Sequence, residues 1–323
     1  MPSARRRRGV AAAAVDKVPR TAFHAAMTPA FGRLGYLGIL RLTGADVVPF
    51  LQGQLTNDMR RLSADQCLLA ALCNPQGRIL ALLRVWQQPS EVLCLLPREL
   101  IAPVGEALRK YVLRAKVRIA AAGEELAVAG SMRPEALRDV GLSAPAPGHH
   151  AHDAGITRVG IAQDASRHWI IGSESALRER LGPGIDAGAE FELRWRGADI
   201  EAGLPQVYAA TREAFIPQML NLDLLDAISF SKGCYTGQEI VARTQHLGRI
   251  KRRLFRVDLA QAGPEIGAVL KLPDGRSGRI AESASIADRH LALAVMNLEP
   301  AVEAEGAAAS TVQGQASLPA YMS

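Results

Sequence analysis

Short apolar segments separated by turn-forming residues characterise the chain from about residue 37 to residue 121. Alternation within such segments is typical of strands, and apolar side chains three or four residues apart are typical of helices. Two apolar segments surround Asn74-Pro-Gln-Gly77, which predicts a hairpin. The expected elements here are strands at 37–42, on both sides of 74–77, at 91–96 and at 116–121, and helices at about 47–55 and 99–113. This mixture predicts an α+β fold class.

The next part of the chain contains one segment that differs in composition. Residues 141–155 are rich in proline, glycine and histidine, which predicts a loop or linker. Its histidines, His149, His150 and His152, have no acidic or cysteine residues at ligand spacing, so we interpret them as solvated and predict no metal site. Beyond it we expect a strand at 167–173, a short helix closed by Gly182, and an alternating segment at 191–205 that enters a loop.

After Gly248 the pattern changes to short strands with frequent turn signals, which predicts an all-β unit, plausibly a small barrel. Residues after Leu298 contain no clear element. The chain of 323 residues, 48% of them hydrophobic, is too long for one ordinary core. We therefore predict a tail at 1–28, a central region of two units at 29–247 and a third unit at 248–323.

The net charge of +6 is concentrated in the tail. Residues 1–28 hold six arginines and lysines against Asp16, so about one net charge remains for the rest of the chain. We expect this tail to be a disordered basic extension, with a start at Met27 left open. No segment approaches the ~20 apolar residues that span a bilayer, which predicts a cytoplasmic protein that does not contact a membrane. Four irregularly spaced cysteines also favour a reducing compartment.

The most distinctive segment is FSKGCYTGQEIVAR, residues 230–243. Thr236 and Glu239 have the spacing of a capping box, which predicts a helix from Gly237 to about Leu247. Cys234 would then lie two residues before the helix cap, near the positive end of the helix dipole and close to Lys232.

Both effects favour the thiolate form of Cys234. Gly233 would let the backbone turn without crowding the sulfur. A small buried cysteine in a tight turn is the alternative, and the residues alone leave the two interpretations even. The other three cysteines, Cys67, Cys73 and Cys94, lie in apolar strand-like segments, so we expect them in the core.

The motif KGCYTGQEIVAR resembles the signature of the YgfZ family of folate-binding proteins, relatives of the glycine-cleavage T-protein that act in iron–sulfur protein maintenance and tRNA modification. The residues shared with this signature include Gly233, Tyr235, Gly237, Gln238, Glu239 and Arg243. The likeness extends from about residue 34 to residue 253 through LTGADVVPFLQGQLTND, NPQGRIL, YVLRAKVRI and DIEAGLP. It implies a T-protein-like fold of three domains, two intertwined α/β domains and a C-terminal small β-barrel.

The resemblance also implies a ligand, tetrahydrofolate or another folate. Trp195 is similar in position to a tryptophan that contacts the folate, and Glu201 to a carboxylate that recognises the pterin ring in the T-protein relatives. The family's second aromatic contact falls near Leu37, where Tyr36 is the available substitute. A carboxylate can accept hydrogen bonds from two neighbouring pterin N–H groups, which explains an acidic group in such a pocket.

The implied function is that of a folate-binding accessory protein for iron–sulfur enzymes, including those that modify tRNA, with Cys234 as the functional thiol and Lys232 beside it. One alternative is a tetrahydrofolate-dependent aminomethyl- or methyltransferase, but no acid follows Gly77 where that enzyme carries one. A conventional aminomethyltransferase is therefore not expected. The other alternative is an RNA-binding module that uses the six cations of residues 243–256. Its partners would be RNA phosphates, whereas the first hypothesis requires iron–sulfur client proteins and at most an indirect contact with tRNA.

Overall fold

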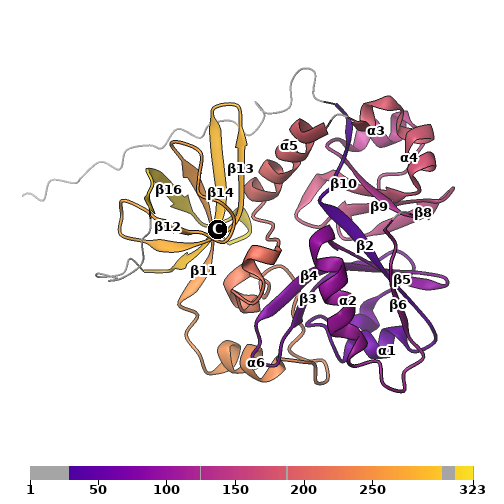
Figure 1. Ribbon diagram of the computed structural model, residues 1–323, viewed down its shortest axis with the longest axis horizontal. Coiled ribbons are helices and arrows are strands. Elements are labelled where there is room, and N and C mark those ends of the chain that lie inside the picture. The colour runs from indigo at the N-terminus through magenta and orange to yellow at the C-terminus, as the bar shows by residue number, and fades with distance from the viewer. Residues whose placement is uncertain (1–28, 124, 187, 300–309, 323) are drawn as a thin grey trace, which may run out of the picture.

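The computed structural model describes residues 29–123, 125–186, 188–299 and 310–322. The predicted tail and Met27 lie outside these residues. Three sheets form the molecule, two of them packed together and the third on the other side of a central helix (Figure 1). The α+β fold class predicted from the sequence is confirmed.

The first two sheets are antiparallel, and the chain passes between them. The first has the order β1-β7-β10-β9-β8 and the second the order β3-β4-β5-β2-β6. The chain therefore starts in the first sheet, builds the second and returns to the first, which is the intertwined arrangement expected. The strands are β1 (Phe31–Arg33), β2 (Leu37–Thr43), β3 (Cys67–Cys73), β4 (Ile79–Gln88), β5 (Glu91–Pro97), β6 (Arg118–Ala121), β7 (Ala127–Ser131), β8 (His150–Asp153), β9 (Ile156–Ile161) and β10 (Asp164–Gly172).

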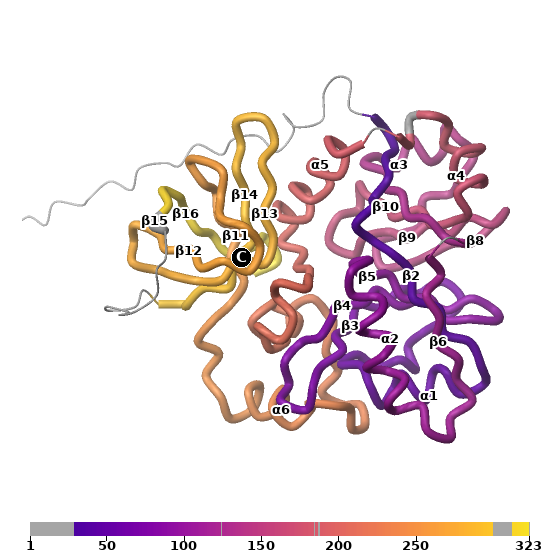
Figure 2. Tube along the Cα trace, in the orientation of Figure 1, coloured from indigo at the N-terminus to yellow at the C-terminus, as the bar shows by residue number. Residues whose placement is uncertain are grey.

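The helices cover the outer faces of these sheets and fill the space beside the third sheet (Figure 2). The α-helices are α1 (Val47–Gln52), α2 (Ile101–Arg109), α3 (Pro134–Asp139), α4 (Glu174–Leu181), α5 (Gly188–Glu201) and α6 (Gln238–His246). Single turns of 3-10 helix lie at η1 (Met59–Arg61), η2 (Arg98–Leu100), η3 (Pro183–Asp186), η4 (Ala209–Thr211), η5 (Pro217–Leu220) and η6 (Ala320–Met322).

The second sheet is buried on both faces. In β2, Leu40 and Leu42 join a core with α1 and α2, whereas Leu37 and Ile39 join a second core with the first sheet. Successive side chains of a strand point to opposite faces, so one apolar strand supplies both cores. The predicted core cysteines agree with this packing, since Cys73 and Cys94 are buried and Cys67 packs at the edge.

The third sheet is a curled six-stranded unit in the order β15-β12-β13-β14-β11-β16 (Figure 1). Its strands are β11 (Arg252–Leu259), β12 (Val269–Lys271), β13 (Ser277–Ile286), β14 (Arg289–Asn297), β15 (Ser310–Thr311) and β16 (Gly314–Ser317). The expectation of no element after Leu298 is wrong, because both edge strands lie there. The chain then returns to the central helix, where the Tyr321 hydroxyl donates a hydrogen bond to Gly203 O at 2.9 Å.

The segment predicted to alternate and enter a loop, 191–205, is instead mostly helix α5. Its buried residues include Phe191 and Trp195, one helical turn apart, so the helical period was present beneath the alternation. Polar residues around them form ion pairs along the helix, Glu190 with Arg194 at 2.8 Å and Glu192 with Arg196 at 3.6 Å. Such pairs stabilise helices.

The proline- and histidine-rich segment 141–155 contains a strand, β8, and the interpretation of its histidines as solvated is wrong for His150. This side chain is 4% exposed, and burial lowers its pKa. Its backbone N–H donates to Asp65 O at 2.6 Å, which ties the first sheet to the loop before β3. Among the residues that the structure describes, no three His, Cys, Asp or Glu side chains are placed to hold a metal ion. Across the same described residues, no helix is long and apolar enough to cross a membrane.

Two tight turns pack backbone against backbone at the end of the second sheet. The turn between β3 and β4 contains Gly77 at φ +69°, and the turn before α6 contains Gly237 at φ +84°. A Cβ on Gly237 would lie 2.5 Å from Asn74 O and 3.0 Å from Gly77 Cα. Both the backbone conformation and the contact therefore require glycine.

We predict that Gly237→Ala lowers the free energy of unfolding by about 2–4 kcal/mol, because strain at positive φ adds to an overlap with backbone atoms. Gly233→Ala is the matched control, since a Cβ there meets nothing within 4 Å. Urea unfolding should show less than about 0.5 kcal/mol of change for the control. Equal values for the two variants would contradict the proposed packing.

Candidate functional site

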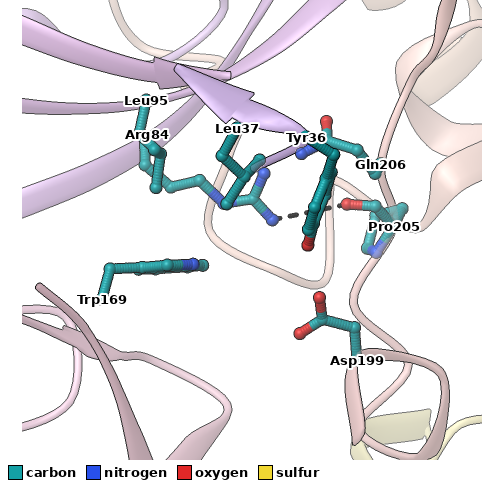
Figure 3. A pocket seen from close by; sticks show the side chains of 8 residues that line it. All are labelled: Tyr36, Leu37, Arg84, Leu95, Trp169, Asp199, Pro205 and Gln206. Carbon is teal, nitrogen blue, oxygen red and sulfur yellow. Dashed lines mark hydrogen bonds between the residues drawn. The ribbon is translucent and has the colours of Figure 1, made fainter. Parts of the chain in front are cut away.

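A small pocket lies where the first two sheets meet the C-terminal end of α5. Figure 3 shows side chains from separate strands and a helix that face one space. They come from the start of β2, from β4 and β5, from β10, and from α5 with the loop that follows it. The lining residues are Tyr36, Leu37, Arg84, Leu95, Trp169, Asp199, Pro205 and Gln206.

Arg84 is a cation flanked by apolar residues in the middle of β4. It is 8% exposed, its guanidinium lies 5.3 Å from the centre of the Trp169 ring, and burial lowers its pKa. Its Nη2 donates a long hydrogen bond, 3.4 Å, to Pro205 O (Figure 3). A guanidinium has five N–H donors, so most of this donor capacity is available to a ligand in the pocket.

Asp199 supplies the opposite charge. Burial raises the pKa of its carboxyl group, while Arg167 acts to lower it. Arg167 is 1% exposed and donates to Asp199 Oδ1 at 2.8 Å and to Asp164 Oδ2 at 2.6 Å. The carboxylate is thereby held in one orientation at the pocket wall, next to Tyr36 (Figure 3).

Of the three residues predicted to contact folate, Tyr36 lines the pocket and the other two do not. Trp195 is wholly buried behind the pocket, with its ring centre 6.3 Å from that of Trp169. Glu201 pairs with Arg289 at 2.7 Å. Their contacts with a folate stay predictions. Sequence reasoning missed Arg84, Trp169 and Asp199, although an arginine inside an apolar strand was a usable signal.

The third sheet contacts the pocket through a buried polar cluster. Arg196 on α5 lies 4.2 Å from the Tyr36 ring centre, and its Nη1 lies 3.2 Å from Glu282 Oε1 on β13. The Tyr208 hydroxyl donates to the other oxygen of Glu282. A β-bulge between Ile280 and Glu282 accompanies this inward position. Burial raises the pKa of Glu282 to about 7.

Cys234 lies on the surface, in the loop before α6. The predicted capping box is wrong, because Gly237 is the N-cap and no side chain caps the helix. Thr236 instead donates to Gln54 Oε1 at 3.4 Å, and Glu239 pairs with Arg243 at 3.0 Å. The left-handed turn at Gly237 places Thr236 outside the helix, so Cys234 is three residues before the cap rather than two.

Lys232 does not direct its charge to the thiol. Its side chain is buried, and Nζ donates to Leu55 O at 2.6 Å and to Asn57 O at 2.8 Å. It also lies 5.1 Å from the Tyr235 ring centre, and burial lowers its pKa to about 8. Lys232 therefore ties the cysteine loop to the segment after α1. The expected steric need for glycine at 233 is absent, since its φ is ordinary and its surroundings are open.

The cations at 243–256 are mostly neutralised by neighbouring acids. Besides the Glu239–Arg243 pair, Arg249 pairs with Glu299 at 2.6 Å, and Arg256 with Asp258 at 2.9 Å. Arg253 is largely buried and pairs with Asp223 at 2.7 Å, where it joins the third sheet to the rest of the molecule. This cluster therefore gives little support to an RNA-binding module at that place.

Three sheets, two of them antiparallel and intertwined and the third curled and mostly antiparallel, define a protein with the fold of the glycine-cleavage T-protein. The solved aminomethyltransferase T of the glycine cleavage system from Bartonella henselae aligns with a TM-score of 0.57 over 83% of this chain and 78% of that one, at 14% identity. Identity this low shows the fold alone. No family model matches the chain.

The chain belongs to the YgfZ family of tRNA-modifying proteins. It is 34% identical over 266 residues to the tRNA-modifying protein YgfZ of Enterobacter sp. (strain 638), covering 79% of this chain and 82% of that protein. The YgfZ protein of Serratia proteamaculans is 34% identical over 259 residues, or 77% and 78% of the two chains. The family predicted from the sequence is confirmed.

We predict a specific pH dependence of stability from Glu282. Its pKa in the folded protein is about 7 against an ordinary value of 4.5, so the folded state binds this proton more tightly. Glu282 therefore contributes stability below about pH 4.5 that is lost as the pH rises through 7. Urea unfolding between pH 5 and pH 8 should show this loss in the wild type and a shallower one in Glu282→Gln. Identical pH profiles would contradict the prediction.

Proposed function

We propose that this protein binds tetrahydrofolate in the pocket and acts as an accessory protein in the assembly or repair of iron–sulfur enzymes, including those that modify tRNA. The observation that carries the folate proposal is a pair of opposite charges, the buried Arg84 and the partly buried Asp199, that line the pocket together with the aromatic side chains Tyr36 and Trp169. The relation to the T-protein fold supports the same ligand class.

A pterin ring matches this arrangement chemically. It is flat and aromatic, so it can pack against Tyr36 or Trp169. One edge carries two N–H groups that can donate parallel hydrogen bonds to a carboxylate such as that of Asp199. The neighbouring carbonyl oxygen can accept a hydrogen bond from a guanidinium such as that of Arg84. A concave site in which a few fixed polar groups converge among apolar and aromatic side chains is the usual form of a small-molecule site.

The aminomethyltransferase alternative receives less support. The strand that follows Gly77 has Ala81 and Leu82 wholly buried, without an acid between Gly77 and Arg84. No carboxylate from this strand is available to assist transfer from an amine. In the proposal, folate is therefore a bound ligand without transfer of an aminomethyl group.

Cys234 is proposed as the functional thiol. It is exposed, whereas Cys73 and Cys94 are enclosed and burial raises the pKa of both thiols. A surface thiol can reach iron or a sulfur group on another protein, as a soft ligand or as a nucleophile. The buried Lys232 holds the backbone two residues away, so the loop presents the sulfur from a fixed base.

We predict that Arg84→Met weakens tetrahydrofolate binding by about 10- to 100-fold, because a charge-assisted hydrogen bond is lost while the strand remains apolar. Glu201→Gln is the comparison, since Glu201 lies outside the pocket lining. Isothermal titration calorimetry should give wild-type affinity for this variant within about twofold. Loss of binding in Glu201→Gln with retention in Arg84→Met would move the site away from this pocket, and a wild type that does not bind would remove the folate proposal.

We predict that Cys234→Ser abolishes rescue of iron–sulfur enzyme activity in a strain that lacks the protein, while its free energy of unfolding changes by less than about 0.5 kcal/mol. The exposed neighbour Ser231 provides the control, and Ser231→Ala should rescue fully. Full rescue by a folded Cys234→Ser protein would exclude the thiol from the function.

A further inference from the structure

A second cationic segment differs from the 243–256 cluster in that its charges are not neutralised. Residues 109–118, RKYVLRAKVR, contain five cations and no acid. Arg109 donates to Ile119 O at 3.1 Å. The other four are exposed, and no ion pair joins them to an acid within the residues described: Lys110, Arg114, Lys116 and Arg118. We refer to residues 109–118 as the basic loop.

The basic loop also presents apolar and aromatic groups to solvent. The predicted helix at 99–113 ends early, with α2 stopping at Arg109, so Tyr111 and Leu113 lie beyond it and are 43% and 90% exposed. Leu113 has φ +40°, an uncommon conformation for a branched side chain. Strained, exposed residues of this kind cluster at functional surfaces more often than elsewhere.

The loop has a fixed base. Its Lys116 N–H donates to Asp46 Oδ2 at 2.7 Å, immediately before α1. The Asp46 carboxylate accepts this backbone contact, and Glu106 is the acid nearest to the basic loop in sequence. The four exposed cations thus give the loop a net positive surface.

The basic loop and the Cys234 loop flank the same short helix. At the start of α1, Asp46 accepts a hydrogen bond from the basic loop at Lys116 N–H. After α1, Gln54 and Leu55 O accept hydrogen bonds from Thr236 and Lys232 around the Cys234 loop. A helix of six residues is about 9 Å long. In Figure 2, α1 and α6 lie at the same end of the molecule. One macromolecule can therefore contact both loops.

We propose that the basic loop, residues 109–118, is an RNA-binding surface on which Lys110, Arg114, Lys116 and Arg118 contact phosphates and Tyr111 stacks on a base. Cations interleaved with an exposed aromatic side chain are the usual components of single-stranded nucleic-acid sites. An acidic protein would not need the exposed ring. The inference goes beyond the accessory function proposed above, which requires no RNA contact.

Fluorescence anisotropy with a labelled, unmodified tRNA transcript tests this surface. For four phosphate contacts, the affinity of the wild type should fall about 100-fold between 50 and 200 mM salt. The loop variant replaces the four exposed cations with glutamine (K110Q, R114Q, K116Q, R118Q) and should bind at least about 30-fold more weakly at 50 mM salt. The control removes the same number of exposed charges from the other cluster (R243Q, R249Q, K251Q, R252Q) and should bind within about threefold of the wild type.

Thermal unfolding confirms that each variant is folded, and tetrahydrofolate titration separates this result from the folate proposal. Retained folate binding with lost RNA binding supports the inference. Three results would overturn it: no salt-dependent RNA binding by the wild type, equal losses in the loop and control variants, or competition by poly-glutamate as effective as that by RNA.

Discussion

The position of α5 depends on buried charge on both of its flanks. On one side Asp199 is held by Arg167 of the first sheet, and on the other Arg196 is held by Glu282 of the third. Removing Arg167 would leave Asp199 without its hydrogen-bonded cation, and breaking a buried ion pair in this way costs about 3–5 kcal/mol. The helix that carries a wall of the pocket is therefore placed by two separate units. A ligand in the pocket would meet groups whose orientation already depends on both.

The loop of Cys234 is also held by buried polar groups, here by hydrogen bonds of side chains rather than by ion pairs. Thr56 accepts from Ala71 N and donates to Ala227 O, while the Asn57 amide donates to Leu69 O and Asp226 O. These side chains join β3 to the segment that leads into the cysteine loop. Lys232 adds a buried ammonium to the same junction. The exposed thiol thus lies on a loop that is anchored by buried, hydrogen-bonded polar side chains. Such fully hydrogen-bonded polar networks hold the backbone in one conformation.

The sequence predicted the elements whose signals are local and periodic. The β3–β4 hairpin around Asn74 and Gly77, and α4 with its stop at Gly182, agree with the structure because turn chemistry and period coincide there. α5 was mistaken for an alternating segment because its ion-paired polar residues obscured the helical period of Phe191 and Trp195. β15 and β16 carry no apolar pattern, since they are short edge strands whose pairing comes from β12 and β11.

The site was less predictable than the fold for a physical reason. A side chain's role depends on what faces it, and that partner comes from distant sequence. Asp199 and Glu201 are two residues apart, yet one meets Arg167 in the pocket wall and the other meets Arg289 outside it. The same holds for charge. Residues 243–256 and 109–118 look alike as strings of cations, but acids of α6, of the chain before it, of β11 and of the segment after β14 neutralise most of the first cluster. Counting charges along the chain identifies candidates, and only the fold decides which of them remain free to bind a polyanion.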